Sequence, residues 1–114
     1  MLVLNHKKFN VYKKSIELVS EIYRLTEKFP NDERYGLISQ LRRSAVSIPS
    51  NIAEGASRKS ENDRKRFYQI VRSSLVELDS QIEISVELDF LENKEIKKLE
   101  KSANAVFAML SKMV

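Results

Sequence analysis

The stretch RRSAVSIPSNIAEG, residues Arg42–Gly55, decides how the rest of the chain is interpreted. Its apolar side chains and the leucine just before it recur at helical spacing in one stripe: Leu41, Ala45, Ile48 and Ile52. Pro49 interrupts this pattern, since it lacks the amide that would bond the Ala45 carbonyl, at a cost of roughly 3 kcal/mol in a helix interior. Either one helix ends near Ser47 and another starts at Pro49, or a single helix runs through. The unbroken stripe favours a single helix, kinked at Pro49.

Helical spacing of apolar residues predicts three further helices around this one. The first runs from Tyr12 to about Phe29 with a broad buried face, and the third runs from a cap at Ser60 to about Leu91. The last is opened by Asn93. Two Gly and two Pro in 114 residues are too few for a sheet protein with many turns. The expected fold is an all-α, up-down-up-down four-helix bundle with a proline-kinked second helix.

The ends of the second helix are also predicted. It should begin between Glu33 and Tyr35, after breakers in the preceding loop, and Gly55 should end it in a left-handed cap. We expect one domain over residues 1–114, in which residues 1–10 form a frayed N-terminal segment.

Several classes of site are disfavoured by composition. The chain has no cysteine, which excludes disulfides and cysteine-based zinc sites, and its single histidine, His6, lies in the segment expected to fray. We therefore expect a non-enzyme without a metal or a cofactor. Lack of cysteine fits a reducing cytoplasm, and no apolar run approaches the length of a membrane span.

A polar row lies opposite the apolar stripe of the second helix: Arg43, Ser47, Asn51 and Glu54. The simplest interpretation is a solvated face. Because Ser and Asn are weak helix formers, the row is also a candidate contact surface. We expect Asn51 and Glu54 to be partly buried and to bond toward the start of the third helix, where Arg58 and Ser60 lie.

Glu77 is expected to join this row from the third helix. It shares a stripe with apolar residues that would draw its carboxylate inward, where it needs a cationic or amide partner such as Arg43 or Asn51. The predicted polar cluster therefore has six members: Arg43, Ser47, Asn51, Glu54, Ser60 and Glu77.

The charges of the expected third helix are divided by sign. Its beginning and the loop before it carry six basic residues: Arg58, Lys59, Arg64, Lys65, Arg66 and Arg72. From Ser73 to Asn93 every charged residue is acidic. A helix dipole prefers the opposite order, so local helix stability does not explain this layout. Either the charges are merely solvated, or the basic end meets an RNA backbone, the acidic end of a neighbouring copy, or both.

Longer segments carry a family resemblance. FPNDERYGLISQLRRSAVSIPSNIAEGASRKS, followed by RFYQIVRSSLVELDSQIE, resembles the bacterial four-helix bundle proteins encoded by intervening sequences of 23S ribosomal RNA genes, also called S23 ribosomal proteins. More distantly the chain is similar to the accessory protein of diversity-generating retroelements, a five-membered ring that binds nucleic acid and a reverse transcriptase. Arg64 and Ser73 depart from the family pattern. The resemblance implies a homo-oligomer, and five is the number of copies that it leads us to expect.

Two functions are consistent with these observations. The first is a non-catalytic, oligomeric bundle that binds structured RNA or a ribonucleoprotein through the basic residues. The alternative is a protein-interaction adaptor without direct nucleic-acid contact. The formal net charge of +4 favours a polyanionic partner only weakly.

Overall fold

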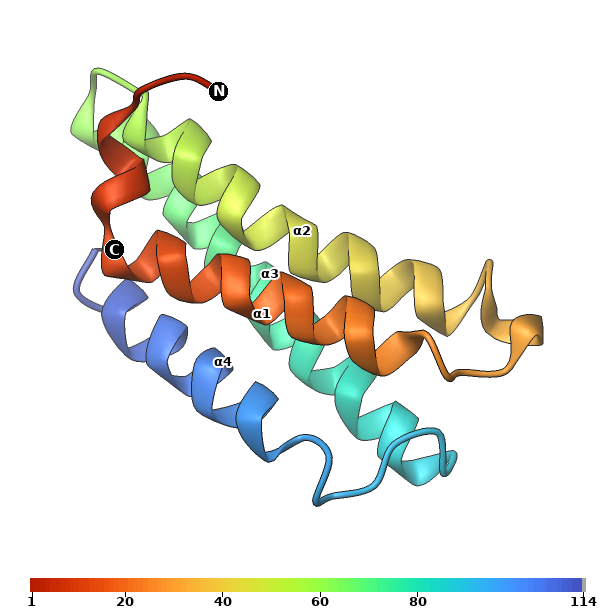
Figure 1. Ribbon diagram of the computed structural model, residues 1–114. Coiled ribbons are helices and arrows are strands. Elements are labelled where there is room, and N and C mark those ends of the chain that lie inside the picture. Colours follow the sequence, from red (N-terminus) through yellow and green to blue (C-terminus); the bar gives the residue numbers. More distant parts are fainter. Residues whose placement is uncertain (114) are drawn as a thin grey trace.

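The protein is a bundle of four antiparallel helices (Figure 1). A computed structural model describes residues 1–113. Its helices are α1 (Asn10–Thr26), α2 (Leu37–Ala56), α3 (Glu61–Glu87) and α4 (Lys97–Leu110), and two short 3₁₀ helices, η1 (Asn5–Lys8) and η2 (Asn31–Glu33), precede α1 and α2. α2 packs against α1 and α3, and α1 also packs against α4, whereas α4 touches α3 along only a short stretch. The predicted up-down-up-down bundle is confirmed.

The apolar stripe predicted for α2 lies at the centre of the core. Leu41, Ala45, Ile48 and Ile52 are fully buried. The other helices surround them with aliphatic side chains that are also fully buried: Leu18, Ile22, Val71, Leu78, Leu99 and Val106. Burying such side chains is the main stabilising contribution in a bundle of this size.

α2 is one continuous helix that contains Pro49. The interpretation with two helices that meet at Pro49 is therefore wrong, whereas the kink stays a prediction. Pro49 itself is buried.

Side chains and close packing shift both ends of α2 from the predicted positions. The helix begins at Leu37 because Asn31–Glu33 form η2, after which Glu33 Oε1 accepts a hydrogen bond from the Leu37 amide at 3.1 Å. The predicted left-handed cap at Gly55 is wrong. Gly55 lies inside the helix, and neither glycine has a positive φ.

α3 ends at Glu87, earlier than predicted, because Asp89 adopts the left-handed conformation with φ 63°. The Phe90 amide bonds the Ser85 carbonyl at 2.9 Å and the Asp89 amide bonds the Val86 carbonyl at 3.0 Å, which is the Schellman pattern. Phe90 then packs on Phe29, with 5.4 Å between ring centroids.

The prediction that Asn93 opens the last helix is wrong. A turn comes first, in which the Glu92 amide donates to Glu95 Oε1 at 2.9 Å, and α4 begins only at Lys97. The helix therefore begins later than predicted, because a side chain closes a turn before it.

One residue of the N-terminal segment packs against the bundle. His6 is buried with 7% of its surface exposed, and its ring stacks edge-on against Tyr12 at 4.7 Å. Met1–Asn5 and Lys8–Asn10 are exposed, so within this segment His6 is the residue that packs on the bundle. Fraying of residues 1–10 stays a prediction.

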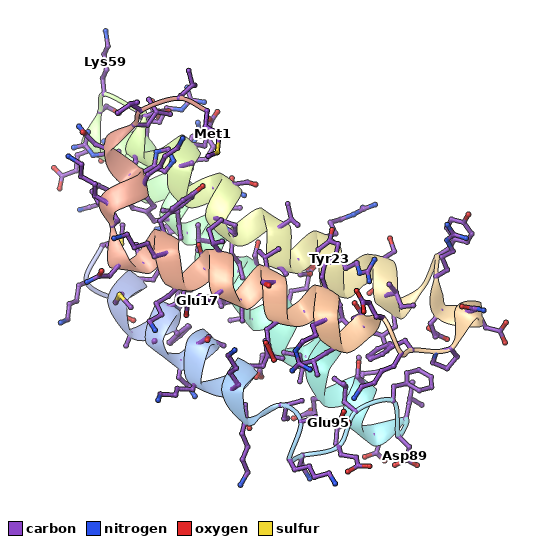
Figure 2. The ribbon with its side chains drawn as sticks, in the orientation of Figure 1. Met1, Glu17, Tyr23, Lys59, Asp89 and Glu95 are labelled. Carbon is purple, nitrogen blue, oxygen red and sulfur yellow. The ribbon has the colours of Figure 1, made fainter. Side chains whose placement is uncertain are left out.

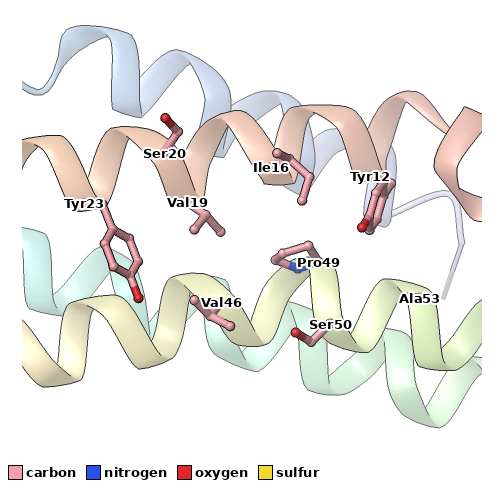
Figure 3. Close-up of a pocket in the computed structure, with 9 residues that line it drawn as sticks. All are labelled: Tyr12, Ile16, Val19, Ser20, Tyr23, Val46, Pro49, Ser50 and Ala53. Atoms are coloured by element: carbon pink, nitrogen blue, oxygen red, sulfur yellow. The ribbon is translucent and has the colours of Figure 1, made fainter. Parts of the chain in front are cut away.

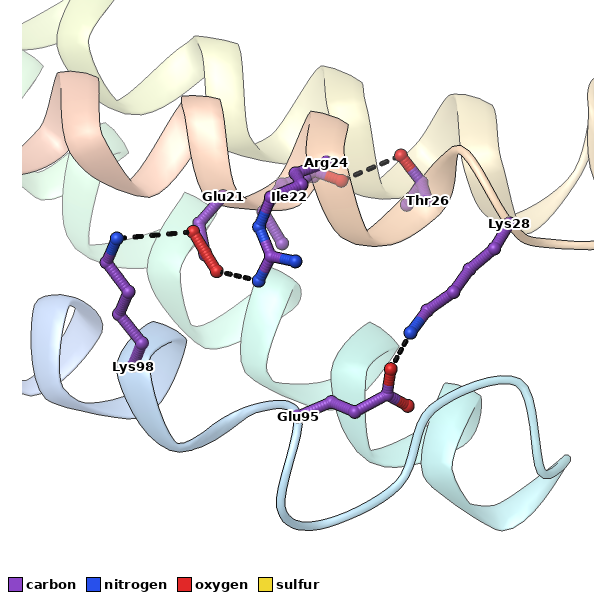
Figure 4. Close-up of polar contacts among 7 residues, drawn as sticks. All are labelled: Glu21, Ile22, Arg24, Thr26, Lys28, Glu95 and Lys98. Atoms are coloured by element: carbon purple, nitrogen blue, oxygen red, sulfur yellow. Dashed lines mark hydrogen bonds and ion pairs between the residues drawn. The ribbon is translucent and has the colours of Figure 1, made fainter.

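Polar contacts connect α1 to its neighbours (Figure 4). Glu21, buried on α1, is paired with Arg24 and lies 3.8 Å from Lys98 Nζ of α4, while Lys28 pairs with Glu95. The hydrogen bond from Arg24 holds the pKa of Glu21 below its ordinary value of 4.5, against the opposing effect of burial.

Glu21→Gln should lower stability in a pH-dependent way. Because the folded-state pKa is lowered, the carboxylate stabilises the fold at pH values above 4.5, and this contribution is lost as pH falls through the folded-state pKa. We expect a cost of about 1 kcal/mol at pH 7 that shrinks below pH 4.5. Urea unfolding across pH measures it. Glu17→Gln, one turn earlier and exposed, is the matched control; equal effects of both substitutions would contradict the assignment.

Candidate functional site

Five of the six predicted basic residues gather at the turn between α2 and α3. This basic corner consists of Arg58, Lys59, Arg64, Lys65 and Arg66. Figure 2 shows Lys59 projecting from this end of the molecule, with Asp89 and Glu95 near the opposite end. Arg72 lies farther along α3, with its guanidinium 5.4 Å from the Phe107 ring of α4.

Gly55 sets how closely the two helices of the corner approach. A Cβ at this position would lie 2.7 Å from Tyr68 Cε1 and 3.0 Å from Phe67 Cβ. Tyr68 is buried there, and burial raises the pKa of its hydroxyl. The glycine therefore serves close helix packing and not a change of chain direction.

Phe67 holds two arginines in place. The Arg58 and Arg66 guanidinium carbons lie 4.8 and 5.2 Å from the centroid of its ring. Such cation–π contacts orient guanidinium groups without neutralising their charge. The Phe67 ring therefore keeps two cations on the surface of the corner.

Arg64 has an internal role that the sequence did not indicate. Its Nη1 donates to the carbonyls of Arg58 at 3.1 Å and Lys59 at 2.8 Å, which ties α3 to the preceding loop. The predicted cap at Ser60 is present, since its hydroxyl accepts from the Asp63 amide at 3.0 Å.

Carboxylates offset part of the positive charge at the corner. Glu61 lies 3.4 Å from Lys65 Nζ, and Asp63 lies 3.9 Å from the Arg66 guanidinium. Both acids are in the first turn of α3, where they favour the helix dipole. All these side chains are exposed, so the pairs are weak and leave the cations accessible to a partner.

The polar cluster is only partly assembled. Ser47 and Ser74 share a hydrogen bond of 2.9 Å between α2 and α3, and Asn51 Nδ2 donates to the Ser47 hydroxyl at 3.0 Å. Asn51 is half-buried as predicted, but its partners lie on its own helix.

Three charged members of the cluster point outward. Glu54 pairs with Arg58 at 2.9 Å as predicted, yet its side chain is 51% exposed, so its expected burial is wrong. Glu77 is exposed rather than drawn inward, because the apolar residues of its stripe, Ile70, Ile84 and Leu88, also face solvent. Arg43 is exposed as well. The serine pair takes the place that we expected Glu77 to occupy.

An apolar hollow of ≈ 560 Å³ lies between α1 and α2 (Figure 3). Tyr12, Ile16, Val19 and Tyr23 line it from α1, on the face that we expected to be buried, and Val46 and Pro49 line it from α2. Ile16 is 45% and Tyr23 40% exposed. The broad apolar face of α1 thus divides between the core and this open hollow. Pro49, singled out in the sequence, faces the hollow.

Arg42 contacts Tyr23, which lines the hollow, and the sequence did not indicate this role. Its Nε donates to the Thr26 hydroxyl at 2.9 Å, and its guanidinium lies 4.3 Å from the Tyr23 ring. Within residues 1–113, no three His, Asp or Glu side chains gather as a metal site would require. In the same range no helix is long and apolar enough to cross a membrane.

The fold and the corner define a small all-α bundle with a basic turn between its second and third helices. The profile of the family described as 23S rRNA-intervening sequence protein matches residues 7–112, and the chain belongs to that family.

A solved structure has the same fold. It is a crystal structure of a protein of unknown function from the S23 ribosomal protein family of Bacteroides thetaiotaomicron, with a TM-score of 0.82 and 20% identity over 90% of this chain and 96% of that one. A search of curated proteins finds no match. The distant resemblance to the retroelement accessory protein stays a prediction.

Gly55→Ala should destabilise the protein by about 1–3 kcal/mol, because the new methyl group would overlap the buried Tyr68 ring. In an open helix the same substitution would stabilise by about 1 kcal/mol. Urea unfolding measures the difference. Glu54→Ala, at the adjacent exposed position, should change stability by less than about 0.5 kcal/mol. A higher midpoint for Gly55→Ala would show that α2 and α3 do not pack as described.

Proposed function

We propose that the protein is a non-catalytic, self-associating helical bundle that binds structured RNA or a ribonucleoprotein through RNA phosphates. The observation that carries this proposal is the basic corner, where five cations gather at one turn against three nearby carboxylates. Lysine and arginine side chains at an exposed turn are suited to phosphate contact, and such contact depends little on base sequence.

The members of the corner differ in what they offer to RNA. Lys59 projects freely, while Lys65 and Arg66 are exposed and only weakly paired. Arg64 is occupied with loop carbonyls. We therefore assign most of the phosphate contact to Lys59, Lys65 and Arg66.

RNA binding should weaken steeply with salt and depend on these three side chains. With a fluorescein-labelled hairpin RNA, Lys59→Glu, Lys65→Glu and Arg66→Glu together should raise the dissociation constant about tenfold or more and lower the salt slope by about three. Fluorescence anisotropy between 50 and 200 mM salt measures both quantities, with circular dichroism to confirm folding.

The matched control reverses three exposed lysines elsewhere: Lys94, Lys97 and Lys101. It makes the same change in net charge, so equal loss in both variants would point to overall charge and not to the corner. If the unaltered protein has no RNA affinity at about 100 mM salt, phosphate binding is excluded.

The second candidate function is a protein-interaction adaptor. The hollow beside Pro49 favours it, because partly exposed apolar residues of two helices line a concave surface there. The same RNA titration separates the two functions, since an adaptor shows no salt-dependent RNA binding.

Self-association is the remaining part of the proposal. The family resemblance predicts five copies, and the division of α3 into a basic start and an acidic second half fits a head-to-tail contact. Light scattering should give five times the chain mass of 13.2 kDa. A mass equal to one chain at micromolar concentration would contradict self-association and leave RNA binding to be judged by the titration.

A further inference from the structure

A groove with an apolar floor and an acidic rim lies between α3 and α4, where these helices are loosely packed. Two hollows of ≈ 280 and ≈ 300 Å³ adjoin there and share Leu75, Asp79 and Ala103. Leu75 and Ile82 are part of the floor, and exposed Phe107 lies at one end. The groove is thus an extended concave surface and not an isolated dent.

Four carboxylates surround this groove: Asp79, Glu83, Glu87 and Glu100. None of them forms an ion pair with another described side chain, although Lys97 and Lys101 lie nearby on α4. An apolar floor within an unneutralised acidic rim is complementary to an apolar segment that carries basic residues. The same rim repels RNA.

The chain itself contains such a segment. Met1–Leu4, here called the N-terminal arm, reads MLVL, and its side chains are exposed by 117%, 72%, 98% and 45% in order. Lys7 and Lys8 follow after Asn5 and His6, and Lys7 Nζ donates to the Leu2 carbonyl of the arm. η1 is held to the bundle by buried His6. The arm is therefore an exposed apolar segment next to two cations, on a fixed base.

The arm does not reach the Asp79–Glu87 part of the groove in its own chain. Figure 1 shows the N-terminus at the end where α2 passes into α3, whereas Asp79–Glu87 occupy the last part of α3. At 1.5 Å per residue, Asp79 lies about 27 Å along α3. Four extended residues span about 13 Å. Contact between the arm and the Asp79–Glu87 part of the groove therefore requires a second copy.

We propose that the N-terminal arm of one copy binds the α3–α4 groove of the next. This inference rests on the proposed self-association and names the segments that produce it. The arm places its apolar side chains on the floor formed by Leu75 and Ile82, and Lys7 and Lys8 face the carboxylates of the rim. The hollow beside Pro49 is a poorer match, because Ser20 and Ser50 line it and no carboxylate does.

Two variants of the full chain test this contact. Leu2→Asp with Leu4→Asp disables the arm, and Glu83→Lys with Glu87→Lys disables the groove. All four side chains are exposed, so the fold should be retained, as circular dichroism can verify. We expect each variant to assemble with an apparent dissociation constant raised about tenfold or more.

Mixing the two variants gives the decisive result. The intact arm of the groove variant can enter the intact groove of the arm variant, and assembly then stops because the other arm and groove are disabled. Light scattering should therefore show a complex of two chains only in the mixture. A mixture that stays monomeric overturns the proposal.

Matched controls use the same types of substitution away from the contact. Tyr35→Asp changes a residue that is 90% exposed in the α1–α2 connection, and Glu17→Lys with Glu27→Lys reverses two exposed carboxylates elsewhere. Both controls should assemble normally. If the arm and groove variants also assemble normally, self-association stands and this inference fails. If the unaltered protein is monomeric, both fail, while RNA binding is decided separately.

Discussion

The close approach of α2 and α3 at Gly55 is the constraint on which the basic corner depends. Without a side chain at this position, the Tyr68 ring lies directly against the α2 backbone, and its neighbour Phe67 reaches the surface of the turn. That ring lies close to the guanidinium groups of both Arg58 and Arg66. A larger residue at position 55 would move α3 and with it the spacing of the cations. A glycine in the last turn of α2 thus affects how charge is distributed on the surface.

The helices and most of the core were predictable from the sequence, because apolar periodicity follows directly from helix geometry. The apolar stripe of α2 is an example. The cap at Ser60 was predictable for a different reason, because serine is a favoured residue at the start of a helix. Helix ends were less predictable, since they depend on single side chains such as Glu33 at the start of α2 and Asp89 at the end of α3. The site was predicted least well. Periodicity gives the face on which a residue lies, but it does not indicate that α1 and α2 leave a hollow or that Glu77 faces solvent.

The arrangement of charge and apolar surface gives the molecule two unlike ends. The basic corner and the N-terminal segment lie at one end, while the acidic half of α3 runs toward the other. Opposite ends of one copy are thus complementary to each other, so identical copies can join head to tail without twofold symmetry. If copies join in this way, each added copy brings one further arm and one further groove, and the rotation between neighbours decides whether the assembly closes.

The loose packing of α4 has a consequence for how the bundle moves. α4 rests chiefly on α1, and the contacts across this seam include Lys98 with Glu21, while the α4 side that faces α3 is partly open. Helices with few buried neighbours open at lower free energy than the rest of a domain, so α4 should exchange its amide hydrogens before α2 and α3 do. A ligand in the groove would contact α3 and α4 together, and its binding free energy would then be added to the opening free energy of α4. Slower amide hydrogen exchange in α4 would then show that the groove is occupied.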